Sequence, residues 1–238
     1  MTDTIFNHRS IRKFKDTPIE QSLLNRILEA GTRASTVGTM QIYSMVVTQD
    51  KELKDKLWEA SFKQDMVKQA PVVVTFCADV NRFHTWCNNR KAEPAYDNFL
   101  WFVNGAIDAV LASQNVSLAA EENDLGICYI GTIPYMADKI IETLNLPKLV
   151  VPVTSIVIGY PDESPGLTDR LPLEAVVHND TYKDYTREDI DRLYAEKESL
   201  PLTRELLEIN NKETLAQVFT ENRYKKDDNI TFSKKYLE

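Results

Sequence analysis

Residues 99–122, FLWFVNGAIDAVLASQNVSLAAEE, form the longest helix that the sequence predicts. The first half of this segment is apolar almost all round, a pattern typical of a helix in a core or at a subunit interface. Asn104 and Asp108 interrupt the apolar run, which is too short to span a bilayer. We therefore expect this helix to lie at the centre of the core or against a second copy of the chain.

Short apolar or β-branched runs on both sides of the long helix predict strands. The run at 71–77 is apolar without a break, which is typical of a strand covered on both faces. The four predicted strands are residues 42–48, 71–77, 126–130 and 153–159.

Amphipathic patterns predict two further helices, over residues 19–32 and 51–64. Thr17 is the expected N-cap of the first, with Pro18 at its first helical position. Strands and helices alternate, but the connections differ in length and do not require regular βαβ units. The chain has only 7 glycines and neither the Gly-x-Gly-x-x-Gly motif nor the P-loop motif, so a dinucleotide-binding Rossmann or P-loop fold is disfavoured.

The composition is that of an ordinary globular protein with an acidic surface. The formal net charge is −8 and the pI is about 5.1, which disfavours nucleic acid and anionic lipid as partners. The cysteines Cys77, Cys87 and Cys128 are odd in number, which argues against a disulfide framework and for a reducing compartment. Cys77, His84 and Cys87 lie near one another, but no second pair completes a metal site. We therefore expect no metal. No signal peptide is visible, so we expect a cytoplasmic protein.

The chain changes character beyond about residue 180. Residues 186–222 are highly charged and helical in pattern, and the tail at 223–238 has few apolar side chains. We therefore predict an organisation in two parts, a core over 1–180 and a charged helical extension over 181–238. Such an extension has a thin core of its own and must pack on the main domain or on a partner subunit.

His8-Arg9-Ser10-Ile11-Arg12 is a compact set of donors for a phosphate or another anion. Arginine offers a bidentate fork and serine a short hydrogen bond. The alternative interpretation is a solvated or helix-capping group of charges.

Five segments, in this order and spacing, resemble the FMN-dependent nitroreductases over most of residues 5–180. The nearest branch is that of the larger, NADPH-preferring, oxygen-insensitive nitroreductases and the flavin reductases of luminous bacteria. The matching segments are residues 8–14, 76–82, 129–131, 159–161 and 170–172, with a weaker match around Leu202-Thr203-Arg204. The resemblance implies an α+β fold, with a mixed, mainly antiparallel sheet flanked by helices. It also implies an intertwined homodimer with FMN bound at the subunit interface.

The resemblance also assigns roles to individual residues. His8, Arg9 and Ser10 would meet the FMN phosphate and ribityl end, and Arg170 would complete the phosphate clamp. Arg12 would lie near the flavin pyrimidine edge, where a cation favours the anionic reduced flavin. The remaining assignments are Thr36 and Gln64 to the ring edge or ribityl chain, Tyr129, Ile130 and Gly131 to backbone contacts near N5 and O4, Thr132 just after them, and Arg204 to the NADPH 2′-phosphate.

Structural alternatives stand beside several of these roles. His8 could orient the first helix, Thr36 could shape its loop, and Gln64 could be an exposed helix end. Tyr129 could be strand core, and Arg204 a surface ion pair.

The sequence departs from the family pattern at three places. Val37-Gly38 stands where the family is richer in serine, and Thr132 stands where a second glycine is common. Thr168 replaces a lysine that often points at the flavin pyrimidine. Arg12 would then be the main cation near flavin N1 and O2, which predicts a lower reduction potential than in close relatives.

The implied activity is an NAD(P)H:acceptor oxidoreductase that works by a ping-pong cycle with FMN. Nitroarenes, quinones and free flavins are the expected acceptors. Because the cofactor carries the chemistry, we name no catalytic residue. The basic residues Arg204, Arg223, Lys225 and Lys226 favour NADPH over NADH.

Two alternatives remain open. One is a non-enzymatic module that binds or delivers flavin. The other is a branch that performs reductive dehalogenation or flavin fragmentation, which would need a substrate lid. The candidate lid, residues 81–96, has no pattern that can be assigned.

Overall fold

The structure is a computed structural model and describes residues 3–237 of the chain. Its internal contacts divide the chain into two compact units. The first unit runs to Gly166 and includes the end of the chain from Lys235, and the second unit is Leu167–Lys234. The predicted division into a core over 1–180 and an extension over 181–238 stays a prediction.

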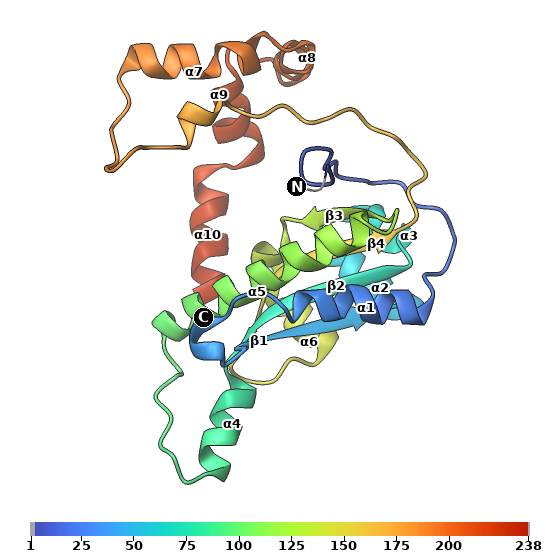
Figure 1. Cartoon of the computed structure of the whole chain (residues 1–238). Helices are drawn as coiled ribbons and strands as arrows, with labels where there is room; N and C mark the ends of the chain where they lie inside the picture. The colour runs from blue at the N-terminus through green and yellow to red at the C-terminus, as the bar shows by residue number, and fades with distance from the viewer. Residues whose placement is uncertain (1–2, 238) are drawn as a thin grey trace. The chain divides into compact units, whose positions relative to one another are not determined.

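The first unit is built on a four-stranded sheet with the order β1-β2-β4-β3, in which every neighbouring pair is antiparallel (Figure 1). Ser10 adds a parallel bridge to Ile127 of β3, which makes the arrangement mixed. The strands are β1 (Tyr43–Thr48), β2 (Val72–Asp79), β3 (Gly126–Ile130) and β4 (Val150–Gly159). The α+β class and the mainly antiparallel sheet are therefore confirmed.

Central strand β2 is buried along its whole length, as its unbroken apolar run predicts. Its side chains alternate between two cores. Val72, Val74 and Phe76 enter the core on one face of the sheet, whereas Val73 enters the core on the other. Burial on both faces explains why the strand has no polar side.

The long helix α5 (Phe99–Glu121) packs against all four strands, and α1 (Gln21–Gly31) packs against α5 (Figure 1). The approach of α1 to α5 requires Gly31, because a Cβ there would lie 2.6 Å from Cγ2 of Val116. The first half of α5 keeps large apolar side chains exposed, Phe99, Leu100 and Ile107 among them. The second half is buried at Ala112, Val116 and Ala120, so the predicted central helix is confirmed.

The opposite face of the sheet carries α2 (Lys51–Glu59), α3 (Met66–Gln69), the 3-10 turn η2 (Ile133–Met136) and α6 (Ala137–Leu144). The predicted helix over 51–64 is confirmed as far as Glu59 and is wrong beyond it, where Phe62 and Lys63 adopt positive φ angles of 52° and 57°. The predicted start of the first helix is also wrong. Glu20, and not Thr17, is its N-cap, and Ile19 lies outside the helix with its side chain buried in the core.

Two further elements complete the first unit, η1 (Val37–Thr39) and α4 (Asn81–Asn89). The end of the chain also belongs to it. Tyr236 donates a hydrogen bond from its hydroxyl to the Pro152 carbonyl at 3.1 Å, and its ring meets Phe102 at a centroid distance of 5.9 Å. Lys235 pairs with Asp138 at 2.7 Å. Burial raises the pKa of Tyr236 to about 12.

The second unit is helical, as the charged pattern predicts. Its elements are η3 (Leu173–Ala175), α7 (Arg187–Ser199), α8 (Pro201–Asn210), α9 (Leu215–Gln217), η4 (Val218–Arg223) and most of α10 (Lys226–Leu237). Pro201 separates α7 from α8, because proline suits the first turn of a helix and not its interior.

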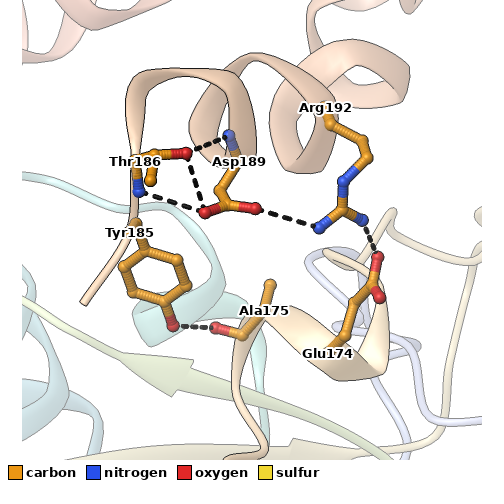
Figure 2. Close-up of polar contacts among 6 residues, drawn as sticks. All are labelled: Glu174, Ala175, Tyr185, Thr186, Asp189 and Arg192. Carbon is orange, nitrogen blue, oxygen red and sulfur yellow. Dashed lines mark hydrogen bonds and ion pairs between the residues drawn. The ribbon is translucent and has the colours of Figure 1, made fainter. Parts of the chain in front are cut away.

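Figure 2 shows how the start of α7 is held. Thr186 and Asp189 form a reciprocal capping box, and the Arg192 guanidinium contacts both Asp189 and Glu174. The Tyr185 hydroxyl donates to the Ala175 carbonyl at 2.9 Å. These contacts tie the segment around η3 to α7.

Candidate functional site

The basic segment His8–Arg12 lies as an extended chain beside β3. Ile11 donates its amide to the Ile127 carbonyl at 2.9 Å, and its side chain is buried. Gly126 makes room for that side chain, because a Cβ there would lie 2.6 Å from Cγ1 of Ile11. Ile11 therefore anchors the segment on β3, between the polar residues Ser10 and Arg12.

The turn after β4 holds the other side of this segment. The Arg9 guanidinium donates from Nη1 to the Pro165 carbonyl at 3.1 Å. Glu163 accepts the amides of Arg12 and Lys13 through Oε1, at 2.5 and 3.1 Å. Glu163 was not predicted as a site residue, because nothing in the sequence around it indicates a contact with the start of the chain.

His8 is oriented by the end of α5. Its Nδ1 lies 2.7 Å from Oε1 of Glu121, and the two side chains are 30% and 12% exposed. A proton on Nδ1 would be donated to that carboxylate, which leaves Nε2 for another partner. The predicted role toward a phosphate is therefore a role for Nε2, and it stays a prediction.

The end of β3 offers open backbone. The Tyr129 hydroxyl lies 3.0 Å from Oγ of Ser113 and 3.2 Å from Oγ of Ser117, so its side chain faces α5. Ile130 is buried, whereas a Cβ on the exposed Gly131 would meet no atom within 4 Å. A planar ligand can therefore approach the main chain at Gly131.

Gln64 and Thr132, two of the predicted site residues, are brought together. The Gln64 amide donates from Nε2 to the Thr132 hydroxyl at 3.0 Å and to the Ser61 carbonyl at 2.9 Å. Lys54 supports the region by donating from Nζ to the Ala70 carbonyl at 2.8 Å, at the end of α3. Burial lowers the pKa of Lys54. In the sequence Lys54 is one charge among several on an amphipathic helix, and nothing there predicts this contact.

The loop that carries Thr36 is held by two opposite charges. Asp108 of α5, 1% exposed, accepts the amides of Val37 and Ile42 at 3.0 and 3.2 Å. The Arg82 guanidinium donates to the carbonyls of Gln41 and Tyr43. Burial raises the pKa of Asp108. An acid inside an apolar helix was the one sequence signal for this clamp, because buried carboxylates need partners.

Three residues of the same loop have positive φ angles. Gly38, Thr39 and Gln41 have φ angles of 53°, 55° and 51°. Two of the three are not glycine, so the surrounding contacts must hold this conformation.

The two remaining candidates lie in the second unit. Arg170 is exposed and donates from Nη1 to the carbonyls of Thr168 and Asp169, at 3.4 and 2.9 Å. Arg204 is exposed on α8. Their predicted roles toward the flavin phosphate and the nucleotide 2′-phosphate stay predictions.

The three cysteines are buried and form no disulfide. Cys77 and Cys128 lie in the sheet, and burial raises the pKa of Cys77 to about 12. Cys87 is buried on α4, and Nδ1 of His84 lies 3.2 Å from the Asn88 amide. Within residues 3–237 no three His, Cys, Asp or Glu side chains gather as a metal site. In the same range no helix is long and apolar enough to cross a membrane.

The donors of the first unit fit a flavin mononucleotide in kind. Arg9, Arg12 and Ser10 offer cationic and hydroxyl donors for a phosphate, and the Gln64–Thr132 pair can meet a polyol or ring edge. The open main chain at Gly131 can face a flat ring. No part of this set clashes with the chemistry of the cofactor that the resemblance implies.

A family model described as the nitroreductase family matches residues 5–160. The chain therefore belongs to the nitroreductase family, a family of oxidoreductases, and the resemblance seen in the sequence is confirmed.

Its relatives agree. FMN reductase (NADPH) of Bacillus subtilis strain 168 is 38% identical over 183 residues, which cover 76% of this chain and 73% of the relative. A second reductase of that strain, named FMN reductase with NAD(P)H as donor, is 37% identical over 186 residues, or 75% of this chain and 73% of the relative. A solved structure from Bacteroides fragilis NCTC 9343 has a TM-score of 0.97 at 52% identity, and the match covers 99% of this chain and 96% of that chain.

Proposed function

We propose that this chain is an FMN-dependent oxidoreductase that takes electrons from NAD(P)H and passes them to a small planar acceptor. The observation that carries the proposal is that the basic segment bridges to β3 at Ile127 and that the open backbone of Gly131 directly follows the same strand. A phosphate and a flat ring could thus be met by one edge of the sheet. The names of the two Bacillus subtilis relatives, both FMN reductases, support the same cofactor.

The residues of the chain bind and orient in this proposal, and none is assigned a chemical step. Bound FMN would supply the hydride chemistry. Arg9 and Arg170 would hold the phosphate, and the Arg12 guanidinium would favour negative charge at the pyrimidine edge. The main chain at Tyr129–Gly131 would face the ring.

NADPH is the proposed donor in preference to NADH. The supporting observation is the exposed Arg204, with Arg223, Lys225 and Lys226 further along the second unit. One relative is named for NADPH and the other for NAD(P)H. A kcat/KM for NADPH well above that for NADH is expected, and equal values would contradict the preference.

A homodimer is proposed as the working form. The exposed apolar side chains along α5, among them Phe99, Leu100, Ile107, Val110 and Leu111, support it because such a stripe is unusual on a monomer. We place this protein in the cytoplasm, as its odd number of cysteines favours, and assign it no nucleic-acid or membrane partner, as its acidic composition favours.

Steady-state kinetics test the proposed cycle. With FMN-loaded protein, the rate is measured against NADPH at several fixed concentrations of a quinone, a nitroarene or free flavin. A ping-pong cycle predicts parallel double-reciprocal lines, since the oxidised nucleotide leaves before the acceptor binds. Intersecting lines would contradict the cycle. Failure to oxidise NADPH with every acceptor would favour a flavin-binding or delivery module instead.

A further inference from the structure

Glu163 makes a long-range contact with the end of the basic segment. It lies in the turn after β4, and its Oε1 accepts two successive amides, those of Arg12 at 2.5 Å and Lys13 at 3.1 Å. A single side-chain oxygen has two lone pairs and can accept both amides at once. Glu163 therefore fixes the main chain at Arg12, the point from which the Arg12 side chain extends.

The main-chain contacts between the same turn and the start of the chain run from Lys15 back to Lys13 and do not include Arg12. Lys15 donates to the Tyr160 carbonyl at 2.9 Å, and Asp162 donates to the Lys13 carbonyl at 2.9 Å. Phe14 and Pro161 form an antiparallel bridge between them. Beyond Lys13 this ladder stops, and the acceptor for the Arg12 amide is the Glu163 side chain. Removing the carboxylate would therefore free the backbone at Arg12 more than at Phe14 or Lys15.

The charges of Arg12 and Glu163 act on the same neighbourhood. Burial is the largest cause that raises the pKa of the Cys128 thiol on β3, and Glu163 raises it further. Arg12 and a hydrogen bond with the Ser10 hydroxyl lower that pKa. The cation and the carboxylate thus both reach the strand that leads to Tyr129 and Gly131.

We propose that Glu163 is a positioning residue of the flavin site, which aligns Arg12 by holding the amides of Arg12 and Lys13. This inference rests on the proposed function. Its consequence is that Glu163 raises the affinity for FMN and controls the reduction potential of the bound flavin. A carboxylate acting by its charge alone would instead repel the phosphate and lower the affinity.

Two substitutions separate the hydrogen bonds from the charge. Glu163→Gln keeps an oxygen acceptor and removes the charge, whereas Glu163→Ala removes both. Asp162→Ala is the matched control, because it removes a neighbouring exposed carboxylate and leaves the Asp162 amide in place. For each full-length protein, FMN affinity is measured by flavin fluorescence and the potential by redox titration. Exchange of the Arg12 and Lys13 amides is followed by NMR on the cofactor-free protein.

For Glu163→Ala we expect the dissociation constant of FMN to rise about tenfold. The amides of Arg12 and Lys13 should exchange at least about tenfold faster. Glu163→Gln and Asp162→Ala should stay close to the wild-type protein in both measurements. Loss of Arg12 alignment weakens binding of the reduced flavin most. If that loss is a further tenfold, the potential in the Ala variant falls about 30 mV below that in the Gln variant.

Wild-type affinity and amide protection in Glu163→Ala would overturn the inference, as would a Gln variant that is as impaired as the Ala variant. Failure of the wild-type protein to bind FMN would overturn the proposed function itself. The two failures are distinguishable, because the first appears in a protein that binds flavin normally. Should Glu163→Ala fail to fold, a Gln variant with slow amide exchange and normal affinity supports the inference, and fast exchange with weak affinity contradicts it.

Discussion

The Gln64 side chain donates a hydrogen bond of 3.0 Å to the Thr132 hydroxyl, which joins the loop before α3 to the end of β3. Thr132 occupies a position where the resemblance favours a second glycine. The hydroxyl gives that position a partner that glycine would lack, and it sets the direction of the Gln64 amide.

Thr132→Val should therefore weaken FMN binding severalfold, because Gln64 loses its acceptor while the shape is preserved. The free energy of unfolding should fall by about 1 kcal/mol, the usual contribution of one hydrogen bond. Flavin fluorescence titration and urea denaturation measure the two effects. Thr231→Val on α10 serves as the control, because its hydroxyl bonds only within its own helix. Unchanged FMN affinity in Thr132→Val would show that this pair does not shape the site.

Asp108→Asn should loosen the loop that carries Thr36. An amide offers one oxygen where the carboxylate offers two, so one of the amides of Val37 and Ile42 is left without its acceptor. An unsatisfied buried donor costs about 1–3 kcal/mol, which urea denaturation at neutral pH should detect. A variant as stable as the wild-type protein would contradict the clamp.

The same pair of proteins gives a pH test. Because burial raises the pKa of Asp108, the folded state binds more protons than the unfolded state between the two pKa values. The contribution of Asp108 to stability therefore falls as pH rises from the unfolded value, near 3.8, through the raised folded value. The difference in unfolding free energy between the wild-type protein and Asp108→Asn should shrink over that window. A difference that grows with pH would be inconsistent with a raised pKa.

Lys197→Met should weaken FMN binding if Arg170 belongs to the phosphate clamp. Lys197 pairs with Asp169 at 2.6 Å, and this hydrogen bond is the largest cause of the lowered pKa of Asp169. Without Lys197, the Asp169 carboxylate is left beside Arg170 and competes for its charge. A severalfold rise in the FMN dissociation constant is expected. The change in stability should be about 1 kcal/mol or less, because the ion pair is partly exposed.

Lys212→Met is the matched control for this prediction. It breaks another 2.6 Å ion pair of the second unit, with Glu221, that has no assigned link to Arg170. Equal effects of the two substitutions on FMN affinity would indicate general loosening of the unit and not a specific action on Arg170.

Thr168→Lys should raise the reduction potential of the bound flavin. The substitution restores the cation that the resemblance places near the pyrimidine edge, and a cation there stabilises the negative charge that reduction creates. Redox titration of the FMN-loaded variant measures the change. A potential equal to that of the wild-type protein would overturn the hypothesis that Arg12 is the main cation near N1 and O2.

Much of the fold could be predicted because its elements have strong local patterns. Strand β3 was predicted with its bounds, and the unbroken apolar run of β2 predicted burial on both faces. The start of α1 and the break after Glu59 could not be predicted in the same way. They depend on burial of Ile19 in a distant core and on positive φ angles at Phe62 and Lys63.

The site was predicted from resemblance and not from local pattern. The sequence brought out Gln64 and Thr132 as separate candidates, and their mutual contact came from the structure. Asp108 and Glu163 act on chain segments 71 and 151 residues away, and separations of that size leave no periodic signal. Arg170 and Arg204 lie in the second unit, whereas the other predicted site residues lie in the first. The roles of these two arginines therefore stay predictions.

The most direct test of the central claim is the visible absorption spectrum of the FMN-loaded protein during addition of NADPH without oxygen. We predict flavin bands that bleach with NADPH and recover when a quinone is added. Bands that persist in the presence of NADPH would contradict the oxidoreductase and favour a flavin-binding module. Failure to take up FMN on reconstitution would contradict the flavin site at His8–Arg12 altogether.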